Sequence, residues 1–211
     1  MSKRITFVLG CVNKLGGTEK ATIDLANLLA KRGYKVNLVS VYRRITNQNN
    51  IYHLENNIDI KYVFSKIEFL KYHLNVYRAL DYISKKKVNK IINQTNPDIV
   101  FYTSIKQIPF EVTKFKKILM VHNCYEYYRS GRLTRSLLNK NYNKIDNIIY
   151  LSKKDLDKYE KEFNAQNGDF VYNISQIPPS KKTKYNNKKI TYMGRLDNNV
   201  KQLDHAILAI D

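Results

Sequence analysis

The first forty residues alternate between two short apolar segments and one amphipathic segment, and this order restricts the fold more than any other feature of the chain. Arg4–Gly10 (RITFVLG) is an apolar run rich in strand-forming residues, and Lys35–Val41 (KVNLVSV) follows the alternation of a second strand. The segment between them has apolar residues at the spacing of one helix face: Ala21, Leu25, Leu28 and Leu29. Two strands joined by a crossover helix pair in parallel. The opening of the chain therefore predicts a βαβ unit.

The ends of the predicted helix carry further signals. Thr18 is expected to be the N-cap, Glu19 complements the helix dipole, and Gly33 lies where a C-cap is expected. Gly16 and Gly17 let the backbone approach a ligand closely, and the free N–H groups of the following helix can bind an anion or a sugar hydroxyl. The dinucleotide fingerprint G-x-G-x-x-G is missing, so a simple tight turn is an equal alternative.

The chain repeats the alternation of strands and helices up to residue 174. Further strands are predicted at Ile58–Val63, Asp98–Tyr102, Lys117–Val121, Asn147–Leu151 and Asp169–Tyr172. Helices are predicted within 66–96, with a break near Asp81 as an alternative, over Thr134–Tyr142, and after a capping box formed by Ser152 and Asp155 up to Phe163. This order is typical of an α/β fold with a Rossmann-like, doubly wound parallel sheet.

Ser175–Lys189 (SQIPPSKKTKYNNKK) interrupts the alternation, because it contains adjacent prolines, many cations and no apolar periodicity. The strand Ile190–Gly194 and a helix from about Val200 follow it. We therefore expect residues 1–174 to form an N-terminal domain and residues 175–189 to form a linker. Residues 190–211 are then the first strand and helix of a truncated C-terminal domain.

The formal charge of +19, from 37 basic and 18 acidic residues, predicts attraction to a polyanion. An anionic membrane face or a phosphate-rich acceptor fits this charge. Nucleic acid fits it less well, because no recognisable nucleic-acid module is present. Two isolated cysteines, Cys11 and Cys124, favour a reducing compartment over a disulfide framework or a zinc site. No apolar segment approaches the roughly twenty residues that span a bilayer. We expect a cytoplasmic protein, either free or peripheral on the inner membrane face.

Two groups of residues near predicted strand ends are candidates for chemistry. Arg195 and Lys201 lie between a strand and a helix N-terminus, where a diphosphate would gain two charge-assisted contacts. Solvated cations in an ordinary βα turn are the alternative. His122 follows a central strand, where it is either a functional group or a structural histidine.

Two cationic clusters complete the set of candidates. Arg129, Arg132 and Arg135 recur at every third residue, and in a helical turn they would form one cationic edge near His122 that suits acceptor phosphates. The long helix carries four more cations: Lys85, Lys86, Lys87 and Lys90. Each cluster is either a solvated face or a binding surface, and for the lysines that surface would be an anionic membrane.

Three features together resemble the family 4 retaining glycosyltransferases of the GT-B fold: GGTEK near the start, His122 after a central strand, and GRLDNNVKQLDHAI beyond the linker. The resemblance covers essentially the whole chain in register. It implies that Gly16 and Gly17 face the donor phosphates and that His122 lies near the reacting sugar. It also implies that Arg195 and Lys201 bind the nucleotide diphosphate.

The chemistry agrees with the last assignment, because negative charge builds up on the departing phosphate and preorganised cations stabilise it. No metal or other cofactor is then expected. The family usually has a glycine where this chain has Gln202. The family's paired glutamates of the C-terminal domain have no counterpart, because the chain ends at Asp211.

The resemblance therefore implies a fragment of a retaining hexosyltransferase-type enzyme that is poorly active alone. Its donor would be a nucleotide diphosphate sugar, and its acceptor a cell-surface polysaccharide, teichoic acid or glycolipid. The alternative is a non-catalytic, glycosyltransferase-like module that binds an anionic polymer or a partner protein.

Overall fold

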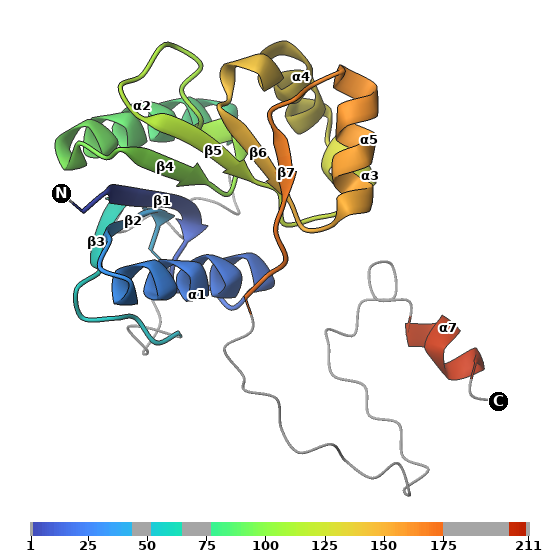
Figure 1. Cartoon of the computed structure of the whole chain (residues 1–211), viewed down its shortest axis with the longest axis horizontal. Coiled ribbons are helices and arrows are strands. Elements are labelled where there is room, and N and C mark those ends of the chain that lie inside the picture. Colours follow the sequence, from blue (N-terminus) through green and yellow to red (C-terminus); the bar gives the residue numbers. More distant parts are fainter. Residues whose placement is uncertain (1, 44–51, 65–76, 175–202, 210–211) are drawn as a thin grey trace, which may run out of the picture. The chain divides into compact units, whose positions relative to one another are not determined.

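The computed structural model describes residues 2–43, 52–64, 77–174 and 203–209 (Figure 1). The chain divides into two units, Met1–Gln176 and Ile177–Asp211. The described part of the second unit is the helix α7 (Leu203–Leu208), within the helix predicted from about Val200. The predicted linker and the strand Ile190–Gly194 lie outside the described residues.

The first unit is built on a seven-stranded sheet in which every neighbouring pair of strands is parallel. The strands are β1 (Arg4–Cys11), β2 (Lys35–Tyr42), β3 (Asp59–Phe64), β4 (Ile99–Tyr102), β5 (Lys116–Met120), β6 (Asn147–Tyr150) and β7 (Gly168–Phe170). Their order is β3-β2-β1-β4-β5-β6-β7, so the chain reverses its direction of winding at β1. The predicted α/β fold with a Rossmann-like parallel sheet is confirmed, and each predicted strand of this unit is present.

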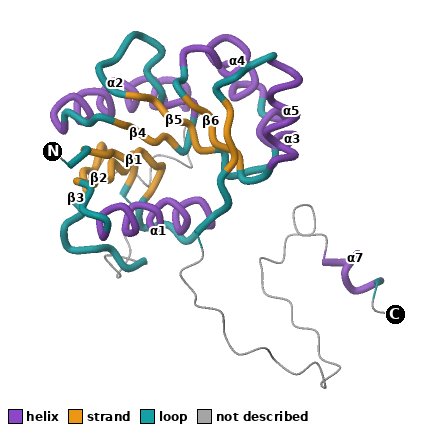
Figure 2. Tube along the Cα trace, viewed as in Figure 1, coloured by secondary structure: helices purple, strands orange, loops and turns teal. Residues whose placement is uncertain are grey.

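Helices lie on both faces of the sheet, but they cover it unequally (Figure 2). They are α1 (Gly17–Lys31), α2 (Tyr77–Thr95), α3 (Tyr125–Ser130), α4 (Arg132–Asn141) and α5 (Lys153–Phe163), with short 3-10 turns η2 (Ile105–Gln107) and η3 (Tyr142–Lys144). On one face, α1 packs against β1 and β2. On the other face, side chains of α2, α4 and α5 form the larger core with the central strands.

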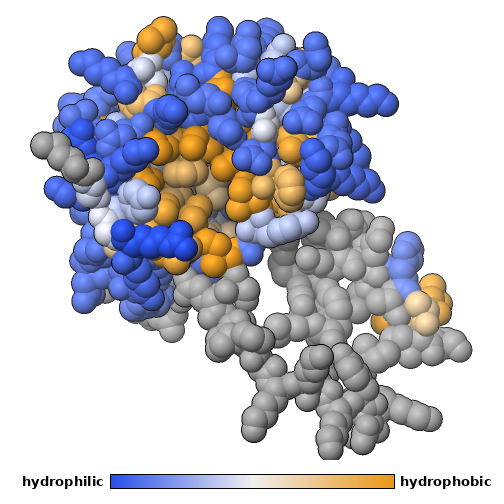
Figure 3. Space-filling model, in the orientation of Figure 1, coloured by the Kyte–Doolittle hydropathy of each residue, from blue (hydrophilic) through white to orange (hydrophobic). Residues whose placement is uncertain are grey.

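The unequal cover leaves one face of the central strands only half-buried. Alternate residues of β4, β5 and β6 are buried toward the larger core, while Ile99, Ile118 and Ile149 point the other way and are half-buried. Figure 3 shows apolar side chains gathered at the centre of the view, over the strands between α1 and α2. Among the described residues, helices therefore cover both faces of the sheet mainly at β1 and β2, where α1 packs.

The ends of α1 confirm one sequence prediction and correct another. The N-cap is Gly16 in an extended conformation, without a side-chain cap, so the prediction that Thr18 is the N-cap was wrong. The C-terminal end is as predicted, because Gly33 has φ +84° and its N–H donates to Ala30 O. Tyr34 N–H completes this Schellman motif through the carbonyl oxygen of Leu29.

Two further helix predictions need correction. The helix predicted over Thr134–Tyr142 begins earlier, at Arg132, and α3 was not predicted at all. The described α2 is one continuous helix through Asp81, which excludes the alternative of a break there. It ends before Pro97, as predicted, with Asn96 in the left-handed region at φ 45°.

A pair of buried tyrosines gives a sharp stability test of this core. Tyr150 and Tyr159 are both fully buried, with ring centroids 5.4 Å apart. The Tyr159 hydroxyl donates to Asn167 Oδ1 at 2.7 Å. The Tyr150 hydroxyl has no hydrogen-bond partner among the described residues, and burial raises its pKa, so it stays protonated.

We expect Tyr150→Phe to raise the free energy of unfolding by about 1 kcal/mol, because it removes an unpaired buried hydroxyl. Tyr159→Phe is the matched control and should lower it by about 1 kcal/mol, because it leaves Asn167 Oδ1 unpaired. Urea unfolding of both variants measures the two changes. A loss of stability in Tyr150→Phe would mean that its hydroxyl has a partner, such as an ordered water.

Candidate functional site

The carboxyl ends of all seven strands lie at one edge of the parallel sheet. The turn after β1, which contains Gly16 and Gly17, and the segment after β5, which contains His122, both emerge at this edge. Only β4 separates β1 from β5, and β1 and β4 flank the point where the winding reverses. In open α/β sheets, ligands bind in the crevice outside the carboxyl ends of the strands at such a point.

Contacts from elsewhere in the chain fix the turn after β1. The Val12 N–H donates to Ser40 Oγ at 3.0 Å, which ties the turn to β2. The Gly16 N–H donates to the Tyr52 hydroxyl at 3.0 Å, and this hydroxyl lies 3.2 Å from Gly16 O, which accepts from it. Gly17, by contrast, is exposed. The turn is thus ordered before any ligand arrives.

Glu19 determines what the start of α1 can bind. The Glu19 carboxylate lies beside Gly16: a Cβ atom there would contact Glu19 Oε2, the end of a flexible side chain that can shift. Glu19 is in the first turn, where the helix dipole favours negative charge, as the sequence predicts. A second anion at this terminus needs cations from elsewhere to offset Glu19.

His122 lies two residues beyond β5 in a segment that is held on both sides. On one side, the N–H of buried Val121 donates to Ile149 O at 2.9 Å. The Nε2 atom of His122 is shielded from water and has no hydrogen-bond partner among the described residues. Burial lowers the pKa of His122 to about 4, so the imidazole is neutral at pH 7. A neutral imidazole can donate or accept a hydrogen bond, but it has no charge with which to stabilise an anion.

On the other side of His122, Asp155 holds the start of α3. Asp155 Oδ1 accepts from the Tyr125 N–H at 2.9 Å, and Oδ2 accepts from Ser152 Oγ at 2.6 Å. Ser152 Oγ in turn accepts from the Asp155 N–H at 3.2 Å and caps α5, which confirms the Ser152 half of the predicted capping box. One carboxylate therefore joins the N-termini of α3 and α5 and limits the movement of the His122 segment.

We expect Asp155→Ala to lower the free energy of unfolding by about 1–2 kcal/mol, because the buried Tyr125 N–H loses its acceptor. Asp155→Asn keeps an acceptor oxygen and should recover most of the loss. Asp157→Ala is the control on the same helix, since its exposed pair with Lys153 at 3.0 Å contributes little. Urea unfolding of the three variants tests this, and equal losses from Asp155→Ala and Asp157→Ala would contradict it.

The three arginines do not form the single helical edge that the sequence predicts. Gly131 separates α3 from α4, which places Arg129 on one helix and Arg132 and Arg135 on the other. Arg129 has a 17% exposed side chain that pairs with Glu162, donates to Asn139 Oδ1 and lies 5.5 Å over the Phe163 ring. Arg132 and Arg135 are exposed. These two arginines remain candidates for contact with an anionic acceptor, whereas Arg129 is engaged within the domain.

The lysines of α2 also divide into two kinds. Lys85 and Lys87 lie 4.7 Å and 4.6 Å over the rings of Phe110 and Phe64, and burial lowers the pKa of Lys85. Lys90 is exposed. Within the described part of the chain, no helix is long and apolar enough to cross a membrane.

Arg195 and Lys201, the two cations predicted to bind the diphosphate, lie outside the described residues. Over 2–43, 52–64, 77–174 and 203–209, the structure has no group of three or more His, Cys, Asp or Glu side chains that could hold a metal ion. Tyr52 and Glu162 were missed by sequence reasoning. No pattern among neighbouring residues points to either of them, because each contacts a residue more than thirty positions away in the sequence.

Residues 15–173 match the family described as Glycosyltransferase Family 4. A curated relative from Haemophilus influenzae, described as an uncharacterized glycosyltransferase, is 27% identical over 203 residues. The match covers 92% of this chain and 54% of the relative. The chain thus spans about half the length of that relative.

Solved glycosyltransferases share the fold at low sequence identity. A mutant of S. aureus TarM, in complex with Fondaparinux, alpha-GlcNAc-glycerol and UDP, aligns with a TM-score of 0.63 at 10% identity, over 86% of this chain and 64% of TarM. WaaG, a glycosyltransferase involved in lipopolysaccharide biosynthesis, aligns with a TM-score of 0.53 at 14% identity, over 79% of this chain and 44% of WaaG. The parallel sheet with its flanking helices is that of GT-B N-terminal domains.

Proposed function

The chain belongs to glycosyltransferase family 4, and from that premise we propose that it is the acceptor-side part of a retaining enzyme. The donor is a nucleotide diphosphate sugar, and the sugar, of hexose type, passes to an acceptor of the cell envelope. Membership of the family favours this function over a non-catalytic binding module.

The observation that carries the proposal is the placement of the Gly16–Gly17 turn and His122 at one edge of the sheet, on either side of β4. The turn is ordered by Tyr52, and His122 brings a neutral imidazole to the same edge. In the proposed enzyme, His122 donates a hydrogen bond to a hydroxyl of the transferred sugar or accepts one from it. Gly17, exposed at the start of α1, lets the donor approach the backbone.

Arg195 and Lys201 are the proposed cations for the leaving diphosphate, as the family resemblance implies. The Glu19 carboxylate already occupies the start of α1, and His122 is neutral, so neither can stabilise a leaving diphosphate. Two cations that arrive from beyond the linker would offset Glu19 and the charge that develops on the leaving phosphate. No metal or other cofactor is then required for the transfer.

Arg132 and Arg135 are the proposed acceptor contacts, because they are exposed on the helix that follows the His122 segment and α3. Guanidinium groups bind phosphate in a bidentate manner, which suits a teichoic acid, a phosphorylated polysaccharide or a glycolipid. TarM was solved with UDP and two glycan-type ligands, and WaaG acts in lipopolysaccharide biosynthesis. We propose that the enzyme works in the cytoplasm, where its net charge of +19 favours contact with the anionic inner face of the membrane.

The test is to incubate the complete gene product with a panel of nucleotide diphosphate sugars and candidate envelope acceptors. We expect acceptor-dependent release of the nucleoside diphosphate with one donor, and a product whose anomeric configuration by NMR matches that donor. An inverted product would refute retention. Tight binding of an anionic polymer without turnover of any donor would favour the non-catalytic module instead.

A further inference from the structure

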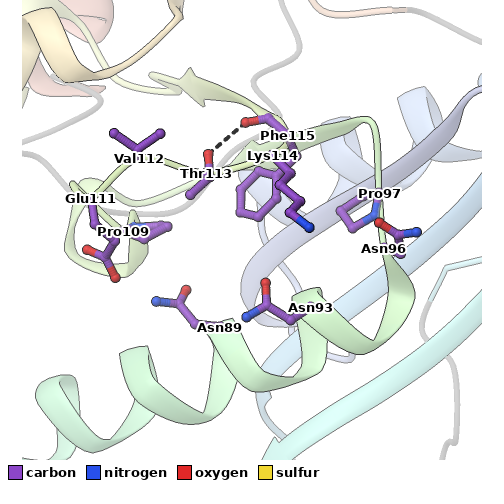
Figure 4. Close-up of a pocket in the computed structure, with 10 residues that line it drawn as sticks. All are labelled: Asn89, Asn93, Asn96, Pro97, Pro109, Glu111, Val112, Thr113, Lys114 and Phe115. Atoms are coloured by element: carbon purple, nitrogen blue, oxygen red, sulfur yellow. Dashed lines mark hydrogen bonds between the residues drawn. The ribbon is translucent and has the colours of Figure 1, made fainter.

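A second candidate site lies at the opposite edge of the sheet from Gly16 and His122. A cavity of about 420 Å³ opens between the C-terminal half of α2 and the segment 109–115 that leads into β5 (Figure 4). Its lining residues precede β4 and β5, so it opens at the amino ends of the strands. We call this cavity the amino-edge groove. It takes no part in the transfer proposed above.

One wall of the amino-edge groove is a row of carboxamides. Asn89, Asn93 and Asn96 line it at spacings of four and three residues, so they follow one face of α2 to its end. Figure 4 shows Asn89 and Asn93 pointing from α2 toward the segment 109–115. Asn93 and Asn96 are exposed, while Asn89 Oδ1 is shielded from water and has no hydrogen-bond partner among the described residues. Each carboxamide offers both a donor and an acceptor.

The facing wall carries apolar residues among polar ones, and hydrogen bonds hold it in place. Pro109 and Phe115 are buried and line the cavity opposite the asparagines. The Thr113 hydroxyl donates to Phe115 O at 2.7 Å. Buried Lys117 donates through Nζ to Glu111 O at 3.2 Å, so contacts fix the segment at both ends. The amino-edge groove is therefore formed before a ligand binds.

The chemistry of the two walls suits a neutral, polyhydroxylated ligand. Sugar hydroxyls need paired donors and acceptors, which the carboxamides provide, and the C–H face of a sugar ring packs on apolar side chains. Among the described lining residues, Lys114 supplies a positive charge and Glu111 a negative one, so the lining carries no net charge for an anion. The volume lies within the range of small-molecule sites.

A shallower hollow extends the amino-edge groove along α2. It has a volume of about 590 Å³ and shares Asn89, Asn93 and Glu111 with the first cavity. Further along α2 it is lined by Lys86, Lys90 and Gln94. Its two lysines give this extension positive charge, so the lining without net charge is that of the first cavity, and the extension offers polar contacts to the rest of an oligosaccharide chain.

We propose that the amino-edge groove is a secondary carbohydrate-binding site that holds a neutral stretch of a glycan chain. Such a site raises the effective concentration of a long acceptor without touching the reacting end. Its ligand chemistry follows from the groove alone, so the proposal does not depend on the activity of the carboxyl edge.

The test titrates the 211-residue chain with maltohexaose, cellohexaose and chitohexaose, followed by two-dimensional NMR of the backbone and asparagine side-chain amides. We expect saturable shifts at Asn89 and Asn93 with at least one of the three glycans. Asn93→Ala, at an exposed helix position, should raise the Kd about fivefold, and Asn89→Ala with Asn93→Ala at least about tenfold, as paired hydrogen bonds are lost. Asn143→Ala, an exposed asparagine on η3, is the matched control and should leave the Kd unchanged.

UDP added in excess should leave the titration unchanged, because the amino-edge groove lies at the other edge of the sheet. The proposal is overturned if none of the three glycans binds, if both alanine variants keep the wild-type Kd, or if UDP competes with the glycan. A gene product that transfers no sugar would refute the proposed function and would leave these NMR results as they are.

Discussion

Alanine in place of Arg195 or of Lys201, introduced into the complete gene product, is expected to lower turnover by about 10²–10³-fold. Departure of the nucleoside diphosphate places negative charge on the leaving phosphate. His122 is neutral at pH 7 and the Glu19 carboxylate lies at the start of α1, so neither of these two groups can stabilise it. In the proposed mechanism, the two cations beyond the linker carry this task.

The measurement is kcat with the preferred donor, and the variants separate charge from shape. Lys201→Arg retains the positive charge and should lose much less than Lys201→Ala. Lys144→Ala removes an exposed cation from η3 and should turn over at the wild-type rate, which controls for the change in net charge. Wild-type kcat in both Arg195→Ala and Lys201→Ala would remove these residues from the leaving-group site.

Acid should destabilise the folded N-terminal unit through His122 by about 3 kcal/mol between pH 7 and pH 4. The unfolded histidine has a pKa of 6.5, and burial lowers the folded pKa to about 4, a difference of about 2.5 units at about 1.4 kcal/mol each. Below pH 6.5 the unfolded chain binds the proton and the folded chain does not. The stability that the neutral His122 imidazole allows is therefore fully present above pH 6.5, and it is lost as the pH falls toward 4.

Urea unfolding at several pH values between 7 and 4 measures this effect as the difference between the wild type and His122→Gln. Protonation of carboxylates acts on both proteins, so it cancels in the difference. His53→Gln is the control, because the His53 side chain is 78% exposed, and it should keep the wild-type pH dependence. If His122→Gln loses stability with acid as steeply as the wild type, the imidazole is not held neutral by burial.

The surroundings of His122 bear on the two hypotheses that the sequence leaves open, a functional and a structural histidine. A purely structural histidine at a strand end would use its ring nitrogens to pair with nearby polar groups. Here Nε2 has no such partner among the described residues, and the segment is held instead by the Val121 N–H and by Asp155. Nε2 of His122 therefore does not hold this segment in place.

Local patterns in the sequence were sufficient for the elements and for their order. Strand and helix periodicities depend only on neighbours a few residues away, which is why Arg4–Gly10, Lys35–Val41 and the Ser152–Asp155 cap were predicted nearly as the structure has them. Parallel pairing followed from the alternation of strands and helices, since such connections allow little else. The structure departs from these predictions at helix ends: the N-cap of α1 is Gly16 in place of Thr18, and Gly131 separates α3 from α4.

The sequence by itself therefore determined the parallel sheet, the edge at which Gly16 and His122 emerge, and the family resemblance. Only the tertiary structure decided how side chains are used. It placed Tyr52 on Gly16, paired Arg129 with Glu162, and lined the amino-edge groove with asparagines of α2 facing Phe115. The physical reason is that periodicity is set by backbone geometry within one element. Whether a polar side chain lies in solvent, pairs with another side chain or lines a cavity depends on which distant parts of the chain pack beside it.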